Sequence, residues 1–277
     1  MKWNIVLDSS CDLKNTSSQS EIGIKIVPLK IIVGEREFCD DDNINTGVLL
    51  EAMKAEKSAS SSACPSPDDF YSCFKSADCS VCITMTGKLS GTYNAARVAK
   101  EMLAEKHPEK RVHIVDSKAT AGKMVLLKMK AQELIEQGTS FEDICNEMDL
   151  YNSQTELVFA LGGYDNLIKT GRMSKIAGIL ATHLGIRAVA VSNDGEIEVV
   201  KKPRGEKHAI AAMAEIMAER KNVCGKKVVI SHCRNFEGAQ SAKKLIEERF
   251  SPAEVYIYEC KGLTSFYTME NGLIIGY

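Results

Sequence analysis

Short apolar runs alternate with longer segments whose apolar residues recur at helical spacing through the first half of the chain. This alternation is typical of an α/β fold with a largely parallel sheet. A β-rich stretch over residues 23–33 is interrupted by Pro28, which indicates a sheet edge or a bend. The expected strands are residues 3–7, 80–85 and 112–115, and the expected helices are residues 93–105 and 122–137.

Capping signals indicate where several helices begin and end. Ser66 precedes a proline and two aspartates, so it predicts a helix start. Gly138 predicts the end of the helix at 122–137, and Thr139 with Glu142 predicts a capping pair for the next helix.

The pattern changes after Asn152, where a hairpin signal, Asn193-Asp194-Gly195, appears among the strands. Because 277 residues exceed what most single cores enclose, we predict two lobes. The first is an N-terminal, mainly parallel α/β domain of residues 1–152, and the second is a C-terminal α+β domain of residues 153–277. The further expected elements are strands 155–161, 188–191, 196–201, 226–231, 254–259 and 273–277 and helices 206–220 and 236–250.

Composition argues against several classes of function. Apolar residues make up 44% of the chain and the net charge is −2, so nothing indicates binding to nucleic acid or to an anionic membrane. The first residues lack the apolar segment of a signal peptide, and no apolar run approaches the length that spans a bilayer. We therefore expect a cytoplasmic protein, by default a monomer.

The chain has ten cysteines. Its CxxC pair, Cys79 and Cys82, enters a predicted strand and lacks a second CxxC that would complete a zinc site. We interpret the cysteines as structural thiols in a reducing compartment, and we expect neither a metal nor a cofactor.

Hydroxyls and glycines gather where the strand at 80–85 meets the following helix, at Ser90, Gly91 and Thr92. A helix N-terminus offers free backbone N–H groups and the positive end of a dipole, so it favours an anion. Ser90 and Thr92 would add hydroxyl donors, and Gly91 would allow a ligand to approach the backbone closely. Ordinary capping of the helix by Ser90 is the alternative.

A second group of hydroxyls, Ser61–Ser66, also precedes a predicted helix. Two such loops at the ends of elements of one α/β sheet commonly face the same crevice. Neither loop matches a phosphate-binding glycine motif, and the chain has no Gly-x-Ser-x-Gly nucleophile elbow.

Motifs of the DegV family resemble segments of this chain, in the family's order and over nearly its whole length. Asp8–Leu13 resembles the opening Asp-Ser-Ser/Thr-x-Asp-Leu, and Ser62–Ser66 resembles the Thr-Ser-x-Pro-Ser loop. Leu89–Tyr93 is similar to the Leu-Ser-Gly-Thr-Tyr core, and Val115–Ser117 to the Val-Asp-Ser that follows it.

This resemblance implies a two-lobed α/β protein that holds one long-chain fatty acid, such as palmitate, in a buried tunnel between the lobes and is not itself a catalyst. It places the carboxylate on Ser62 and Ser90, with the backbone of Gly91 and Thr92 nearby. Tyr267 or Thr268 is expected to replace a histidine that touches the carboxylate in many relatives, because this chain has no histidine after His232.

Two further motifs lie in the second half. Leu167–Arg172 is similar to Leu-x-Lys-Gly-Gly-Arg, and Arg204–Lys207 to Arg-Gly-x-Lys. In some members these arginines, here Arg172 and Arg204, lie where a separate fatty acid kinase docks and phosphorylates the carboxylate. The resemblance therefore implies a carrier in phospholipid metabolism, although solvated surface arginines are the alternative reading.

Burial of the tail supplies the expected affinity, since each CH₂ removed from water contributes about 0.8 kcal/mol. Small aliphatic and methionine residues of the second lobe, at Ile176–Ala181 and Ala209–Met213, are candidates for an adaptable tunnel wall. Plain core is the alternative for both segments.

Three other functions remain open from the sequence. A serine hydrolase would use Ser90 as nucleophile and would need a base; His232, which follows a strand, is the best-placed histidine to reach a crevice, although we favour a structural role for it. The Asp8 and Asp12 pair, or the run Asp40–Asp42, could hold Mg²⁺, although such runs are usually solvated turns. A lipid sensor that docks a partner without transferring its ligand is the third.

Overall fold

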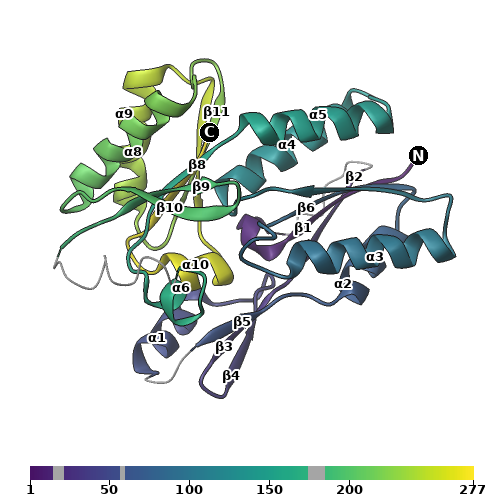
Figure 1. Cartoon of the computed structure of the whole chain (residues 1–277), viewed down its shortest axis with the longest axis horizontal. Coiled ribbons are helices and arrows are strands. Elements are labelled where there is room, and N and C mark those ends of the chain that lie inside the picture. The colour runs from purple at the N-terminus through teal and green to yellow at the C-terminus, as the bar shows by residue number, and fades with distance from the viewer. Residues whose placement is uncertain (15–21, 57–59, 174–184) are drawn as a thin grey trace.

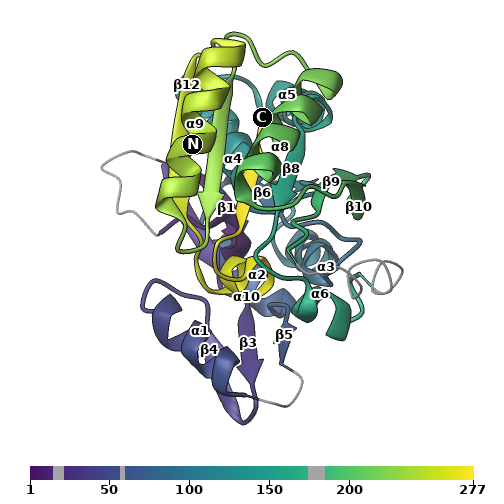
Figure 2. The same cartoon turned by 90° about the vertical axis from the view of Figure 1, so that its left-hand side faces the viewer.

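The computed structural model describes residues 1–14, 22–56, 60–173 and 185–277. Two lobes lie side by side, and a small sheet projects from the first lobe (Figures 1 and 2). The predicted fold class, a parallel N-terminal sheet followed by an α+β second half, is confirmed.

The first lobe is built on a four-stranded parallel sheet with the strand order β2-β1-β6-β7. Side chains alternate across it: Ile5 and Leu7 lie in the core beneath α4 and α5, and Val6 lies in the core beneath α2 and α3. Both faces are therefore covered by helices. The bounds are β1 (Trp3–Asp8), β2 (Ile22–Val27), β6 (Cys79–Thr84), β7 (Arg111–Asp116), α2 (Pro67–Lys75), α3 (Thr92–Lys106), α4 (Gly122–Glu136) and α5 (Phe141–Gln154).

The second lobe holds a six-stranded sheet with the order β10-β9-β8-β13-β11-β12. Strands β11 and β12 are parallel, and the other neighbours are antiparallel. Helices α8 and α9 cover its outer face (Figure 1). The bounds are β8 (Leu157–Ala160), α6 (Asp165–Lys169), β9 (Val189–Asn193), β10 (Glu196–Lys201), α8 (Glu206–Arg220), β11 (Lys227–His232), α9 (Phe236–Phe250), β12 (Glu254–Glu259) and β13 (Leu273–Gly276).

Helix α4 joins the lobes, because its first turn lies directly on the second sheet. A Cβ atom on Gly122 would lie 2.6 Å from the carbonyl oxygen of Val229, and one on Gly276 would clash with the backbone of Gly122 and Lys123. Only glycine at both positions permits this approach.

A third, antiparallel sheet of order β4-β3-β5 packs with α1 and α10, and most of this unit was not predicted. Although α10 comes late in the chain, it lies against elements of the first lobe. Asp40 holds its first turn by accepting hydrogen bonds from the backbone N–H groups of Gly262 (2.8 Å) and Leu263 (3.0 Å). The bounds are β3 (Lys30–Val33), β4 (Arg36–Cys39), α1 (Thr46–Ala55), β5 (Ser61–Ala63) and α10 (Gly262–Thr268).

Most local signals are confirmed and one is wrong. Ser66 forms a capping box with Asp69 at the start of α2, and the Asp194-Gly195 turn has the positive φ angles of a tight hairpin. Thr139 does not cap α5. Its N–H bonds to the carbonyl of Leu134 and so closes the preceding helix, while Ser140 caps α5.

Candidate functional site

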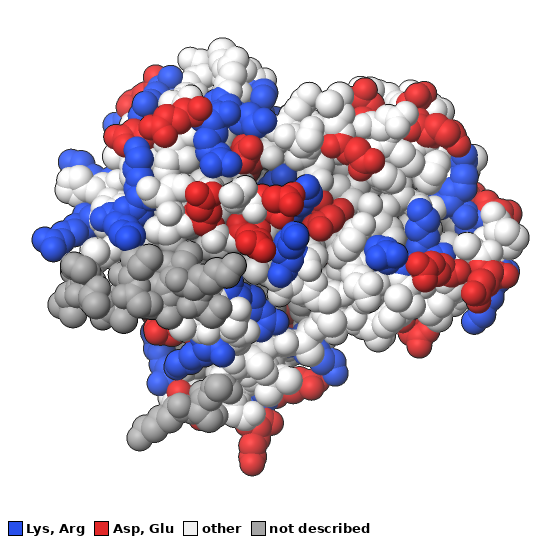
Figure 3. Space-filling view, viewed as in Figure 1, with Lys and Arg blue, Asp and Glu red and all other residues white. Residues whose placement is uncertain are grey.

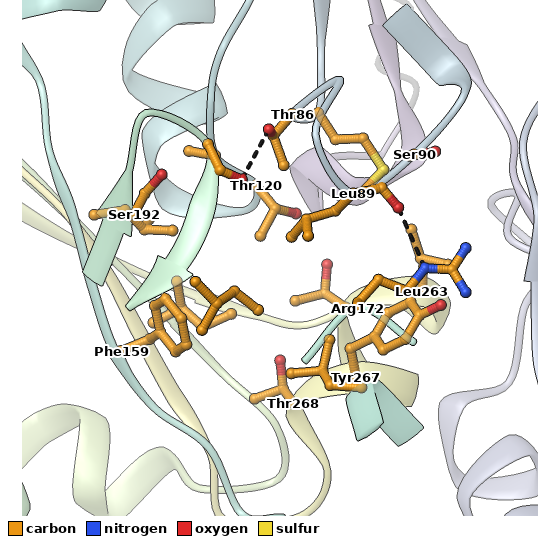
Figure 4. Close-up of a pocket in the computed structure, with 18 of the residues that line it drawn as sticks. Thr86, Leu89, Ser90, Thr120, Phe159, Arg172, Ser192, Leu263, Tyr267 and Thr268 are labelled. Carbon is orange, nitrogen blue, oxygen red and sulfur yellow. Dashed lines mark hydrogen bonds between the residues drawn. The ribbon is translucent and has the colours of Figure 1, made fainter. Parts of the chain in front are cut away.

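A cavity lies between the lobes and is closed on one side by α10 (Figure 4). It contains about 800 Å³ of space not filled by atoms, part of it open to solvent. Most of its lining is apolar and comes from both lobes: Leu29, Met85, Leu89, Ala119, Leu157, Phe159, Leu161, Leu167, Ile197, Leu263 and Ile274.

Polar side chains gather at one end of this cavity. The hydroxyl oxygens of Ser62, on β5, and Tyr267, on α10, lie 2.8 Å apart. The guanidinium carbon of Arg172 lies 5.9 Å from the centre of the Tyr267 ring. Ser90 lines the same end, on the side of Arg172 and Tyr267 in Figure 4. The structure therefore brings together four of the residues singled out from the sequence.

Ser90 belongs to a turn that precedes α3. Its Oγ lies 2.8 Å from Thr92 Oγ1 and accepts a hydrogen bond from the Thr92 N–H at 3.3 Å. The N-cap of α3 is Gly91, and no side chain caps this helix. Ordinary capping by Ser90 is thus wrong, since the serine lies one residue too early.

Gly91 and Thr92 do not line the cavity themselves. Thr92 is fully buried, and Gly91 is exposed beside the loop that follows β5. A Cβ atom on Gly91 would lie 3.2 Å from Cys64 Sγ. This contact places the loop after Ser62 against the start of α3, so that both serines reach one end of the cavity.

The two arginines lie in different surroundings. Arg172 is half-buried and lines the cavity, where it donates hydrogen bonds to the carbonyls of Leu89 (3.2 Å) and Thr170 (3.1 Å). Arg204 is exposed and is not among the lining residues.

Helix α10 supplies Leu263, Thr264, Tyr267 and Thr268 to the wall. Thr264 was not singled out from the sequence, nor was the helix itself. Leu263 and Phe266 are buried in the first-lobe core, which fixes the rotation of the helix and turns Tyr267 toward the polar end. No local signal marked this helix, because the carboxylate that accepts the N–H groups of its first turn, Asp40, lies 222 positions away in the chain.

Buried carboxyls lie behind α10. Asp8 accepts from the N–H groups of Ser10 (3.0 Å) and Met85 (2.6 Å), and Asp12 accepts from the N–H of Lys261 (2.9 Å). Burial raises the pKa of Asp8 to about 6 and that of Asp12 to about 7, because it disfavours the charged form.

The surroundings of these carboxyls do not support the alternative that they hold Mg²⁺. Asp40 is fully buried rather than in a solvated turn, and its oxygens bond to backbone N–H groups. Among the described residues, no cluster of three or more histidine, cysteine, aspartate or glutamate side chains could hold a metal ion.

The hydrolase alternative requires a base close to Ser90. His232 does not line the cavity; its Nδ1 accepts from the N–H of Asn235 at 3.2 Å, and its ring packs edge-on against Phe236. Burial lowers the pKa of His232. His107, His113 and His208 also lie outside the lining, and His183 lies outside the described residues.

The candidate tunnel material of the second lobe also lies elsewhere. Ala209, Ala212 and Met213 of α8 belong to the core between that helix and the second sheet, and the lining contains none of them. The plain-core reading is thus the right one for this segment. Ile176–Ala181 lies outside the described residues.

Basic and acidic side chains are interspersed over the face seen in Figure 3. Within residues 1–14, 22–56, 60–173 and 185–277, no helix has the length and apolar character needed to cross a bilayer.

Comparison with known proteins now decides the family. The model of a family described as uncharacterised proteins of the DegV type matches residues 2–275. The chain belongs to the DegV family. A DegV domain-containing protein of Streptococcus gordonii is 38% identical over 279 aligned positions, which cover 100% of this chain and 99% of the relative. One from Streptococcus pyogenes serotype M1 is 37% identical with the same coverage.

Solved DegV structures share the fold. The Streptococcus pneumoniae Fatty Acid Kinase (Fak) B3 protein, loaded with linoleic acid, superimposes with a TM-score of 0.96 at 36% identity, covering 100% of this chain and 99% of its own. A DegV protein of Eubacterium eligens, loaded with heptadecanoic acid, has a TM-score of 0.93 at 31% identity, covering 99% and 98%. A DegV protein of Ruminococcus gnavus, refined with vaccenic acid, has a TM-score of 0.93 at 27% identity, covering 99% of both chains.

Proposed function

We propose that this DegV protein binds one long-chain fatty acid, with the acyl chain in the apolar cavity and the carboxylate at its polar end. The observation that carries the proposal is the largely apolar cavity itself, at one end of which the hydroxyls of Ser62, Ser90 and Tyr267 lie together with Arg172. Relatives of the same fold at 36% and 31% identity carry linoleic and heptadecanoic acid.

The polar end can supply donors to a carboxylate. Ser62 and Tyr267 form one pair of hydroxyls, and Ser90 and Thr92 form another. Each pair has two protons but needs only one for its own hydrogen bond, so one proton per pair remains for a ligand. We assign Ser90 as one direct donor and the Ser62–Tyr267 pair as the source of the other, with Ser62 donating to Tyr267 and Tyr267 donating to the carboxylate. Thr268 is part of the wall, and Gly91 and Thr92 are the backbone that positions Ser90.

The tail supplies most of the affinity. A tail of about sixteen carbons gains on the order of 10 kcal/mol from burial before the costs of association and ordering. Burying a carboxylate that keeps several hydrogen bonds costs less free energy than this gain. Burying an unpaired carboxylate would cost more than the gain. The hydroxyls therefore fix the orientation of the ligand.

The role that fits these features is a non-catalytic carrier. Ser90 has Thr92 as its hydroxyl partner, and no described histidine lines the cavity to activate it. We further propose that the protein presents its fatty acid to a separate kinase, as the name of the Fak B3 relative suggests, with the exposed Arg204 at the docking surface and Arg172 near the carboxylate.

Native mass spectrometry of the purified protein tests the binding function. The expected spectrum contains one added mass equal to a long-chain fatty acid, and palmitate added to delipidated protein restores it. Ile197→Trp, which fills the cavity from β10, abolishes the added mass, while Val200→Trp, at an exposed position of the same strand, retains it. Absence of a fatty acid after palmitate is added to the folded wild type refutes the proposal.

A further inference from the structure

Across the cavity from Tyr267 and Arg172, the two lobes meet in a contact that we call the tail clasp. It runs from Thr86, in the turn that leads to Ser90, to Ser192 on the far side of the cavity. It consists of Thr86, Lys118, Ser192, Asp194 and Gly195. In Figure 4, Ser192 lies on the left of the cavity, across from Ser90, Arg172 and Tyr267. Thr86, Lys118, Ser192 and Gly195 line the cavity, so the clasp forms its wall.

Three polar contacts hold the clasp together. Thr86, in the loop after β6, donates a hydrogen bond to the Gly195 carbonyl in the β9–β10 turn at 3.0 Å. Ser192 donates to the carbonyl of Lys118, and the ammonium of Lys118 pairs with the carboxylate of Asp194. All three contacts join the first lobe to the same hairpin of the second.

The hairpin turn lies tightly against the first lobe at Gly195. A Cβ atom there would clash with Thr86 Oγ1 and lie 3.2 Å from Lys88 Cγ. Gly195 also has a φ of +89°, which side chains rarely permit. The β9–β10 turn therefore packs directly against the loop after β6.

The clasp does not suit a carboxylate. Thr86 and Ser192 each donate their single hydroxyl proton to a backbone carbonyl, as does the neighbouring Thr120, which bonds to Ser10 at 3.1 Å. Lys118 is neutralised by Asp194. The hydroxyls at this end therefore have no proton to spare, in contrast to the hydroxyl pairs at Ser62 and Ser90. The carboxylates of Asp194 and Glu196 lie beside Lys118 and disfavour a further carboxylate, so this end receives the methyl end of a ligand.

We propose that the tail clasp is the end stop that sets the longest acyl chain the protein accepts, with Thr86, Lys118 and Asp194 as the residues that determine this limit. The inference rests on the proposed function. Each added CH₂ raises affinity about fourfold while the tail still fits. A longer tail must displace the hairpin and break the clasp, so the gain ends there.

Removing the ion pair of the clasp should lower the stability of the fold only slightly, because the pair is exposed. The side chains of Lys118 and Asp194 are 51% and 66% exposed. Exposed pairs contribute little stability. Substitutions there can therefore change the limit without unfolding the protein.

The test is a competition measured by native mass spectrometry. Delipidated protein receives an equimolar mixture of saturated fatty acids from about twelve to about twenty-four carbons, which spans the range over which affinity should rise and then stop rising. The variants are Asp194→Asn, which keeps a good turn residue before Gly195 but removes the charge, and the double variant T86V/D194N. The matched control is Glu37→Gln, which removes the exposed Lys30–Glu37 pair of another hairpin, outside the cavity lining.

We expect the wild type and the control to show one upper limit of chain length. The double variant moves this limit to acids at least two carbons longer and raises their bound fraction about tenfold or more, with Asp194→Asn intermediate. A limit unchanged in folded T86V/D194N and in Asp194→Asn overturns the inference while fatty acid binding stands. Failure of the wild type to bind any acid refutes the proposed function and the inference with it.

Discussion

The hydroxyls of Ser62 and Tyr267 lie 2.8 Å apart, although 205 positions separate the two residues in the chain. Ser62 lies on the projecting sheet and Tyr267 on α10, which Asp40 attaches to that unit. The polar end of the cavity therefore depends on a helix that comes late in the chain but packs on the first lobe. In our proposal the phenol of Tyr267 takes the place that the family resemblance would give to a histidine.

Tyr267→Phe removes the hydroxyl while keeping the ring that packs on Phe266. We expect the affinity for palmitate to fall about tenfold or more, since a hydrogen bond to a charged group contributes about 1.5–3 kcal/mol. A titration of delipidated protein with palmitate measures the change. Tyr71→Phe, which removes a hydroxyl outside the lining, is the control and keeps wild-type affinity. Equal affinities for all three proteins would show that Tyr267 does not bind the carboxylate.

Arg172 and Arg204 should separate ligand binding from docking. Arg204→Ala is expected to keep wild-type affinity for palmitate, because the side chain is exposed and outside the cavity, and to lower phosphorylation of the fatty acid by a kinase catalytic subunit. Arg172→Ala is expected to lower both, because Arg172 lines the cavity and lies over the Tyr267 ring. Coupled titration and phosphorylation assays give the two readouts. Unchanged phosphorylation with Arg204→Ala would remove it from the docking surface.

Buried Asp12 predicts a pH dependence of stability. Its pKa is about 7 in the folded protein against an ordinary value of 3.8, so the fold binds a proton that the unfolded chain releases. The stability from this proton is fully present below about pH 4 and is lost as the pH rises through about 7.

Asp12→Asn tests the direction of this pH dependence. Asparagine can accept the N–H of Lys261 and tolerates the positive φ of 60° at this position, but it does not ionise. The free energy of unfolding of the variant, measured in urea and compared with wild type, should therefore improve steadily from about pH 4 to about pH 7 and then level off. A constant difference across that range would contradict the raised pKa of Asp12.

The parts of the fold that could be predicted are those whose patterns are local. Helices at Glu206–Arg220 and Phe236–Phe250 have the bounds expected from their spacing, and the Asp194-Gly195 turn forms as its residues dictate. Helix α10 could not be found in this way. It is short, nearly all of it is buried, and it is held by Asp40, which is distant in the chain.

The same distinction holds for the site. Ser90 was singled out because it precedes a helix, which is a local signal, and Ser62 because its loop also precedes a helix and resembles a DegV motif. The clasp was not, since Thr86, Lys118 and Gly195 become neighbours only when the lobes pack. The apolar stripe at Ala209–Met213 was ambiguous because core helices and tunnel walls have the same composition, and packing against the second sheet decides between them.

The contact between Gly91 and Cys64 should control the distance between the two serines. Gly91→Ala places a methyl group 3.2 Å from Cys64 Sγ, which is tight enough to push the loop after Ser62 away from α3. The φ of −73° at Gly91 suits alanine, so the backbone itself is not strained. We expect the affinity for palmitate to fall several-fold, about 1 kcal/mol.

Cys64→Ala provides the matched background for this prediction, because it removes the sulfur atom that the new methyl group meets. In that background Gly91→Ala should change the affinity little. Alanine is a poorer N-cap than glycine, so the loss of stability should be the same in both backgrounds, about 1 kcal/mol or less. A double-mutant cycle of palmitate titrations and urea unfolding measures both quantities. If Gly91→Ala lowers the affinity equally with and without the sulfur, the spacing of the serines does not depend on this contact.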